Sequence, residues 1–224
     1  MRNVLGLLAA AAFVLGPGLA ALRLVPPLAG FVLFALGGLI ALVVGAVSAV
    51  QAARGRGLGA GGAAALAVAL VFLGAAARGA GAPRINDFTT DLAAPPAFKH
   101  AATLPQNQGR DLGYPPAFAE QQRTCCADLK PALVPPGRDA LEHARVVAEK
   151  MPSWEITWVD QQGNVIEAIA TSRLFGFQDD IVIRVRPETD GSSRVDVRSK
   201  SRDGQGDMGV NAQRIRDYVA AATR

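Results

Sequence analysis

Acidic side chains are missing from the first third of this sequence. The first Asp or Glu is Asp87, and the only charged side chains before it are six arginines, at positions 2, 23, 54, 56, 78 and 84. Cysteine and histidine are also scarce, with two of each in 224 residues. Two cysteines exclude a disulfide scaffold and a four-cysteine zinc site. A content of 50% hydrophobic and 19% charged residues excludes a disordered chain.

The net charge of +4 does not indicate a nucleic-acid-binding protein. Six of the 23 basic residues lie in the first 84 positions, so the remainder carries 17 basic and 19 acidic residues, a net charge of −2. Nucleic-acid-binding proteins concentrate basic residues on the folded domain. Arginines that flank apolar segments mark membrane boundaries instead. We therefore expect no nucleic-acid partner.

The sequence also lacks the common catalytic and cofactor motifs. It contains no G-x-S-x-G, P-loop, Rossmann fingerprint or H-E-x-x-H. Residues 55–62 are rich in glycine, but no strand precedes them and no lysine follows, so they do not form a phosphate-binding loop. We predict no catalytic residue, no cofactor and no metal site. Cys125 and Cys126 leave three states open: free thiols, a vicinal disulfide, or a bridge between chains.

Three apolar stretches separate the first arginines, at about residues 4–22, 28–50 and 58–77. Each is close to the roughly 20 residues that a helix needs to cross a bilayer. None contains a charge, and a chain in lipid must pair its own backbone polar groups. The sequence therefore predicts three transmembrane helices within residues 1–80, and membrane lipid as their surroundings.

Two questions about this region stay open at the level of sequence. Residues 4–22 also resemble a secretory signal peptide, with Arg2 before the apolar run and small residues at 18 and 20. With a cytoplasmic N-terminus, Arg2, Arg54 and Arg56 lie inside together with the α-amino group, and Arg23, Arg78 and Arg84 lie outside, so the positive-inside rule favours this orientation by the α-amino group alone. With three spans, the rest of the chain would then be periplasmic, and the protein would be a multi-pass protein of a bacterial inner membrane.

The remainder divides into a linker and a small domain. Residues 81–130 are rich in proline and are interpreted as a linker, and residues 131–224 as an α+β domain. Helical periodicity covers residues 139–151 and 210–222. Alternating apolar and polar residues predict strands at 154–158, 165–172, 181–186 and 194–200. We expect a four-stranded antiparallel sheet covered by two helices, with Arg184, Arg186 and the charged side chains of residues 194–200 on its polar face.

Two runs carry a family resemblance: residues 173–180 (RLFGFQDD) and residues 198–215 (RSKSRDGQGDMGVNAQRI). Together they resemble the family catalogued as domain of unknown function 1499, which occurs in bacterial envelopes and plastids. The resemblance covers residues 131–224. Residues 85–91 (INDFTTD) and the prolines at 95 and 96 are similar to the approach segment of membrane-anchored proteobacterial members. The resemblance implies an envelope location and no particular reaction.

The second run suggests an anion site. Arginine suits carboxylate and phosphate groups, and the start of a helix attracts anions. The alternative is internal, with the arginines paired to aspartates and Asp207 capping the last helix. The candidate residues for binding an anion or a partner are Arg173, Arg198, Ser199, Ser201, Arg202, Asp207, Asn211 and Arg214.

Asp179 and Asp180 form the only adjacent acidic pair in the first of these runs. Paired acids can divide general-acid and general-base roles. Neighbours in a strand point to opposite faces, however, so a shared substrate is not expected.

Three functions follow from the sequence. The first is a non-enzymatic domain outside the cytoplasm that recognises an anionic envelope polymer, a lipid or a membrane-protein partner. The second is a structural subunit of an inner-membrane assembly, and the third is an envelope-acting hydrolase that uses Asp179 or Asp180.

Overall fold

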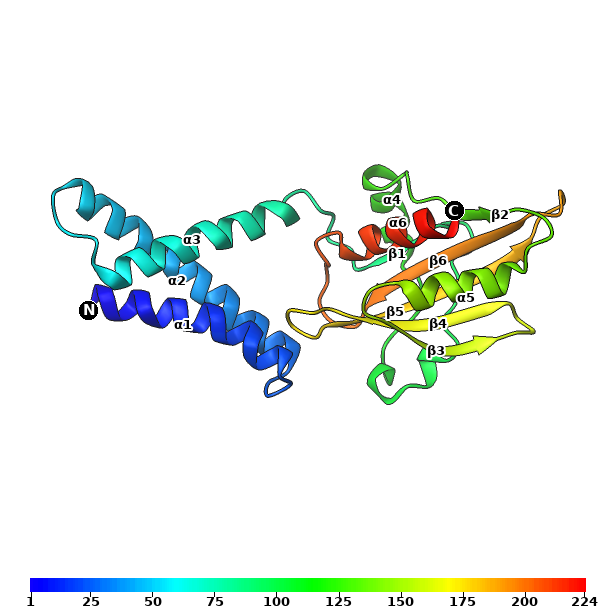
Figure 1. The fold of residues 1–224 in the computed structure, drawn as a ribbon, viewed down its shortest axis with the longest axis horizontal. Coiled ribbons are helices and arrows are strands. Elements are labelled where there is room, and N and C mark those ends of the chain that lie inside the picture. The colour runs from blue at the N-terminus through cyan, green and yellow to red at the C-terminus, as the bar shows by residue number, and fades with distance from the viewer. The chain divides into compact units, whose positions relative to one another are not determined.

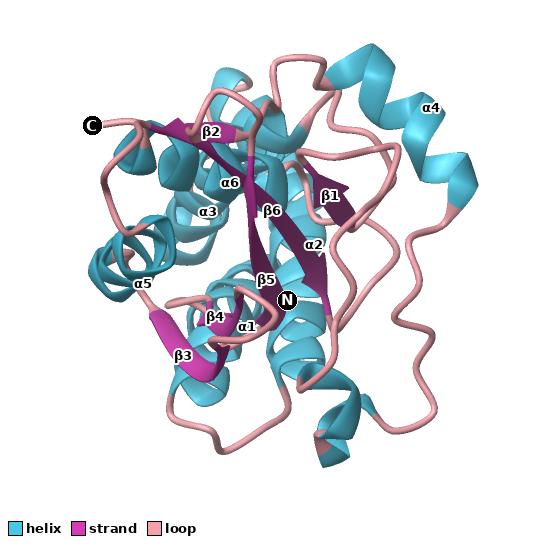
Figure 2. Cartoon of the chain, turned by 90° about the vertical axis from the view of Figure 1, so that its right-hand side faces the viewer, coloured by secondary structure: helices cyan, strands magenta, loops and turns pink.

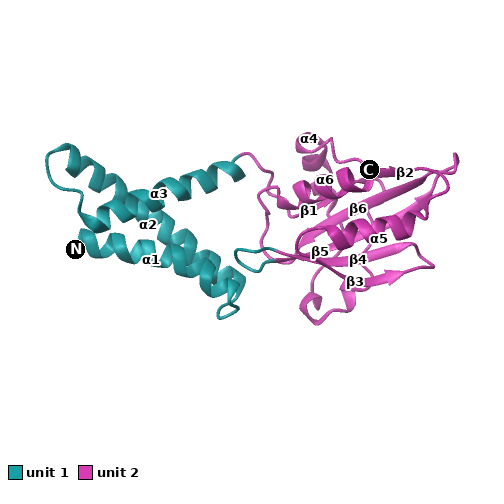
Figure 3. Ribbon diagram, in the orientation of Figure 1, with its two compact units in different colours: residues 1–80, 172–177 teal, residues 81–171, 178–224 magenta.

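The computed structural model describes residues 1–224 and divides them into two compact units (Figure 3). Unit 1 comprises Met1–Ala80 together with the loop Ser172–Phe177. Unit 2 comprises Gly81–Thr171 and Gln178–Arg224. The division at Ala80 agrees with the change of composition in the sequence, where the first acidic residues begin.

Unit 1 contains the three predicted spans as helices α1 (Arg2–Ala21), α2 (Pro27–Ala53) and α3 (Gly59–Gly79). All three are long and apolar enough to cross a membrane, with mean hydropathies of 2.1, 2.5 and 2.1. Large apolar side chains along them remain exposed, such as Leu8, Val43 and Leu70, as expected for surfaces that face lipid. These helices make the chain a membrane protein.

Small residues let the helices of unit 1 approach closely. Gly37 of α2 lies against α1 so tightly that an added Cβ would be 2.6 Å from the backbone nitrogen of Phe13 and 2.7 Å from the carbonyl oxygen of Ala9. By contrast, nothing lies within 4 Å of a Cβ added at Gly74 of α3. Since lipid tails are as apolar as the side chains, such close packing is what holds membrane helices together.

Unit 2 is built on one antiparallel sheet of six strands, rather than the four that the sequence predicts (Figure 1). The predicted strands are β3 (Trp154–Asp160), β4 (Val165–Thr171), β5 (Gln178–Pro187) and β6 (Ser193–Ser201). The two additional strands are β1 (Asp87–Thr89) and β2 (Ala132–Val134), both paired with β6. The order is β1-β6-β5-β4-β3. Strands of three residues are too short to show an alternating pattern, which is why the sequence does not predict them.

The proline-rich segment 81–130 belongs to unit 2 and contains local structure. Besides β1 it forms the 3₁₀ turns η1 (Ala101–Thr103) and η2 (Pro105–Asn107) and the helix α4 (Pro116–Cys125). Pro116 occupies the first turn of α4, where its missing N–H breaks no helical hydrogen bond.

The two faces of the sheet have different covers (Figure 2). Helices α5 (Ala140–Lys150) and α6 (Val210–Ala222) match the predicted helices and cover one face. The main core lies there and includes the stacked rings of Trp154 and Tyr218, with centroids 5.4 Å apart. The other face is covered by residues 90–113, here called the cover segment, whose Phe98 and Ala101 pack on Val165 and Val182.

Candidate functional site

The alternation of β5 and β6 separates an apolar face from a charged face, as the sequence predicts. Ile181, Ile183, Val195 and Val197 point toward the helices and are fully buried. The opposite face, under the cover segment, carries the charged side chains of the two strands other than Asp179. These are Asp180, Arg184, Arg186, Arg194, Asp196, Arg198 and Lys200. Because five of the seven are basic, this face needs acidic partners from elsewhere in the chain.

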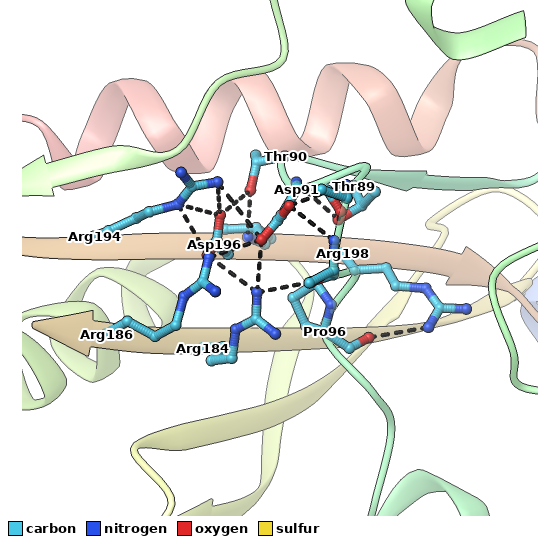
Figure 4. Close-up of polar contacts among 12 residues, drawn as sticks. Thr89, Thr90, Asp91, Pro96, Arg184, Arg186, Arg194, Asp196 and Arg198 are labelled. Atoms are coloured by element: carbon cyan, nitrogen blue, oxygen red, sulfur yellow. Dashed lines mark hydrogen bonds and ion pairs between the residues drawn. The ribbon is translucent and has the colours of Figure 1, made fainter. Parts of the chain in front are cut away.

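Asp91 of the cover segment is one of these partners (Figure 4). Its Oδ2 lies 3.0 Å from Arg184 and 2.7 Å from Arg186, and the same two guanidinium groups reach Asp196 at 3.2 and 2.7 Å. Arg194 adds a contact of 3.0 Å to Asp196, whose side chain is fully buried. Three guanidinium groups therefore surround two carboxylates, and the ion pairs attach the cover segment to the sheet.

Hydrogen bonds act against burial in setting the charge of Asp91. Burial by itself raises the pKa of its carboxyl, but the backbone N–H of Ala94 and the guanidinium groups of Arg186 and Arg194 outweigh it, so the pKa lies below its usual value. The carboxylate is thus stabilised in its charged form by the same contacts that fasten the segment.

Asp87 of β1 provides the second acidic partner. Arg198 donates to both of its carboxylate oxygens, at 2.9 and 2.7 Å, and Lys200 donates at 3.0 Å. The Arg198 side chain is 2% exposed, and its remaining hydrogen bonds go to the carbonyl oxygens of Pro96 and Leu112. Two cations around one buried carboxylate leave a positive surplus at this point of the sheet.

A cavity of about 630 Å³ lies beside Arg198, between the cover segment and α4. The rings of Phe98 and Tyr114 contact the Arg198 guanidinium, with its Cζ 4.8 and 5.5 Å from their centroids. Burial, together with the charge of Asp87, raises the pKa of Tyr114 above its usual value, so this phenol stays neutral. The cavity is lined by Leu92, Pro95, Ala97, Phe98, Leu112, Gly113, Tyr114, Pro116, Ala119, Arg123 and Arg198.

The lining is apolar apart from Tyr114 and the two arginines, and it contains no carboxylate. The side chain of Arg123 is exposed and makes no hydrogen bond or ion pair within the chain. Volume, apolar walls and a few convergent polar groups are the usual features of a small-molecule site. An arginine without a partner at its edge favours an anionic group on the ligand.

The sequence-predicted anion site is divided between the two faces of the sheet. On the helix side, Arg214 donates to Asp179 at 2.6 Å and to Ser199 at 3.1 Å. Asn211 joins the same cluster, accepting from Ser199 at 2.5 Å and donating to Ser201 at 2.8 Å. These five side chains meet near the start of α6 but bond to one another.

On the opposite face, Arg202 donates to Asp180 at 3.0 and 2.6 Å and to Gln178 at 2.6 Å. Asp180 is fully buried and also accepts from Asn107 and Arg110 of the cover segment. The two adjacent acids therefore point to opposite faces, as expected for a strand, and each has its own arginine.

Two further candidates lie outside both clusters. Asp207 accepts from the backbone N–H groups of Gly209 and Asn211, at 2.9 and 2.7 Å, in the capping role that the sequence offered as an alternative. Burial raises its pKa above the usual value. Arg173 lies in the loop Ser172–Phe177 between β4 and β5.

Cys125 and Cys126 at the end of α4 form a vicinal disulfide, one of the three states that the sequence left open. The two histidines have other contacts: His100 stacks on Trp158, and the Nε2 of His143 lies 2.8 Å from the carbonyl oxygen of Ala222.

Sequence reasoning missed the residues contributed by the cover segment and its flanks. Asp87, Asp91 and Arg110 pair with the sheet, and Glu167 of β4 accepts from three backbone N–H groups at Lys99, His100 and Ala101. One signal was available. The predicted strands 181–186 and 194–200 place five basic residues and one acidic residue on one face, so acids from outside those strands had to approach it.

Comparison with known proteins supports the family resemblance and extends it. No curated protein and no solved structure is significantly similar to the chain. A family model described as "Protein of unknown function (DUF1499)" matches residues 87–221, from β1 into α6, and so includes the cover segment and the cavity. On this match over more than half of its length, the chain belongs to the DUF1499 family.

Proposed function

We propose that the chain is a membrane-anchored binding protein whose unit 2 takes an amphiphilic anion of the bacterial envelope into the cavity beside Arg198. The ligand class is an apolar chain that ends in a carboxylate or phosphate. The observation that carries the proposal is the lining of the cavity, with apolar walls, two arginines and no acidic side chain.

The two arginines have different roles in this proposal. Arg198 is buried and held by Asp87, so it contributes a fixed positive field and the aromatic contacts around it. Arg123 is exposed and available for a direct, charge-assisted hydrogen bond. Fixed and available charge together favour an anionic head group over a neutral or cationic one.

The proposed location is the periplasmic side of an inner membrane. A cytoplasmic N-terminus places Arg2, Arg54 and Arg56 inside and Arg23, Arg78 and Arg84 outside, so the positive-inside rule favours this orientation only through the α-amino group. Three spans then carry unit 2 outside, where envelope lipids and their precursors are accessible. The site residues near α6 bond internally in the structure, which is why the proposal rests on the cavity.

The test measures binding of dodecyl phosphate and dodecanoate by the full chain in nanodiscs of zwitterionic lipid. Arg123→Glu removes one positive charge and adds a negative one, and we expect roughly tenfold weaker binding, equivalent to about 1.4 kcal/mol. Arg138→Glu makes the same charge change at an exposed arginine outside the cavity and should leave binding unchanged. Ala97→Trp, at an exposed wall position, should obstruct the cavity.

The two probes distinguish the head groups, since a site built for phosphate binds the first more tightly. Equal affinities for Arg123→Glu, Ala97→Trp and the unmodified chain would contradict the proposal. If α1 to α3 alone then retained the chain in a stable complex, the structural-subunit function would be favoured instead.

A further inference from the structure

The loop Ser172–Phe177 is apolar although it connects two strands of a charged sheet. It carries Leu174, Phe175 and Phe177 within four residues, with Arg173 at its start. Leu174 is 55% exposed. Loops at the end of a sheet are normally polar and solvated, and three large apolar side chains in four residues depart from that pattern.

Within unit 1, the loop packs on the first turns of α2. The Phe175 ring lies 5.5 Å from the rings of both Phe31 and Phe34, and the Phe177 ring lies 6.1 Å from that of Phe31. Because α1, α2 and α3 cross in alternating directions, the start of α2 is on the same side of the membrane as the end of α3.

The length of α2 sets the depth of this contact. Its 27 residues span about 40 Å, whereas the hydrocarbon core is about 30 Å thick. Phe31 is the fifth residue of α2, about 6 Å along the axis from the first, so it lies close to the boundary between hydrocarbon and head groups. A ring packed on Phe31 lies at that boundary as well.

Part of the loop backbone is paired within the loop. The N–H of Ser172 donates to the carbonyl oxygen of Phe177 at 2.8 Å, and that of Gly176 to Ser172 at 2.9 Å. The N–H of Phe177 donates to the Ser172 hydroxyl at 2.9 Å. Gly176, at a φ of +75°, closes this compact turn. Pairing of these three N–H groups lowers part of the cost of moving the loop out of water.

We propose that the loop Ser172–Phe177 is a second membrane contact, which inserts Leu174 into the lipid interface beside α2. Phe175 and Phe177 hold the loop against the phenylalanine rings of α2. Arg173 lies at the level of the lipid phosphates, as basic side chains at membrane boundaries do. The contact is independent of the cavity proposed above.

The test uses the full chain in vesicles, with a single fluorescent nitrobenzoxadiazole label at Leu174→Cys. The native cysteines are protected by their disulfide under non-reducing conditions, and the unmodified chain serves as the labelling blank. Asp190→Cys is the matched control, because the β5–β6 turn lies at the opposite end of the sheet. We expect blue-shifted emission and loss of fluorescence with nitroxide-labelled lipids for Leu174→Cys, and neither for Asp190→Cys.

A Leu174→Cys label that is quenched by aqueous iodide as strongly as the control, and not by nitroxide lipids, overturns the proposal. A further variant, Phe34→Ala, separates lipid from protein contact. Persistent quenching by nitroxide lipids supports insertion into lipid, whereas its loss would show that the loop only docks on α2 and would also overturn the proposal.

Discussion

Arg198 and Asp87 show how charged side chains are stabilised in the interior of unit 2. Both side chains are almost completely buried, and each finds partners on several sides: carboxylate, carbonyl oxygens and aromatic rings for the arginine, arginine and lysine for the aspartate. A buried pair of this kind adds little net stability over an apolar pair, but removing one partner is strongly destabilising.

We therefore expect Arg198→Met to lower the free energy of unfolding by about 3 kcal/mol, because Asp87 keeps only Lys200. Denaturant titration followed by tryptophan fluorescence measures the change. The double variant Arg198→Met with Asp87→Asn should recover part of the loss. A single variant as stable as the unmodified chain would show that the pair contributes nothing.

The variant Arg202→Ala distinguishes the two interpretations of the run 198–215, an anion site or internal ion pairs. The Arg202 guanidinium donates two hydrogen bonds to Oδ1 of the buried Asp180, so Arg202→Ala should cost about 2 kcal/mol of stability and leave binding of dodecyl phosphate unchanged. Thermal melting and the binding assay are run on the same sample. The opposite result, weaker binding with an unchanged melting temperature, would restore the anion site that the sequence predicted near α6.

At the scale of elements, the cover segment depends on charge. It lies on the polar face of the sheet through ion pairs such as those of Asp91 with Arg184 and Arg186, rather than through a large apolar core. Its attachment should therefore respond to pH.

The direction of this pH dependence follows from the lowered pKa of Asp91 in the folded chain. Stability from such a group is present above the unfolded value of about 3.9 and is lost as the pH falls through the lower folded value. We expect protease cleavage within residues 90–113 to increase below about pH 4. Asp91→Asn should be cleaved more readily already at neutral pH and show less additional change in acid.

The helices of unit 1 depend on shape rather than charge. Gly37→Leu would place a side chain into the backbone of α1, so we expect lower thermal stability in detergent and impaired insertion. Gly74→Leu is the matched control, because the space around Gly74 is open. Equal behaviour of the two variants would show that the close approach of α1 and α2 is unimportant.

At the scale of the whole molecule, the chain combines three candidate membrane spans with a folded unit of the DUF1499 family. The charges on the two sides of the spans differ little. The proposed orientation places the C-terminus outside the cytoplasm. A C-terminal alkaline phosphatase fusion should be active, and a matching green fluorescent protein fusion should be dark. Protease added to intact spheroplasts should cut unit 2, and protection there with cleavage in opened vesicles would reverse the orientation.

The sequence alone determined those features that depend on local patterns. Uncharged runs of sufficient length specify α1 to α3, since a single segment in lipid can pair its backbone N–H and C=O groups within itself only as a helix. Alternation specifies β3 to β6, and with them the separation of Asp179 from Asp180, because neighbouring strand residues must face opposite ways. Helical periodicity likewise specifies α5 and α6.

Only the tertiary structure decided how the proline-rich segment is used. Asp87 lies 111 positions from Arg198, and Asp91 lies 93 from Arg184, so no local pattern connects them. Strands of three residues and an irregular cover segment take their conformation from the charged sheet face, not from their own propensities. The cavity forms where that segment and α4 meet over Arg198, which is why its lining could not be deduced from the chain in sequence order.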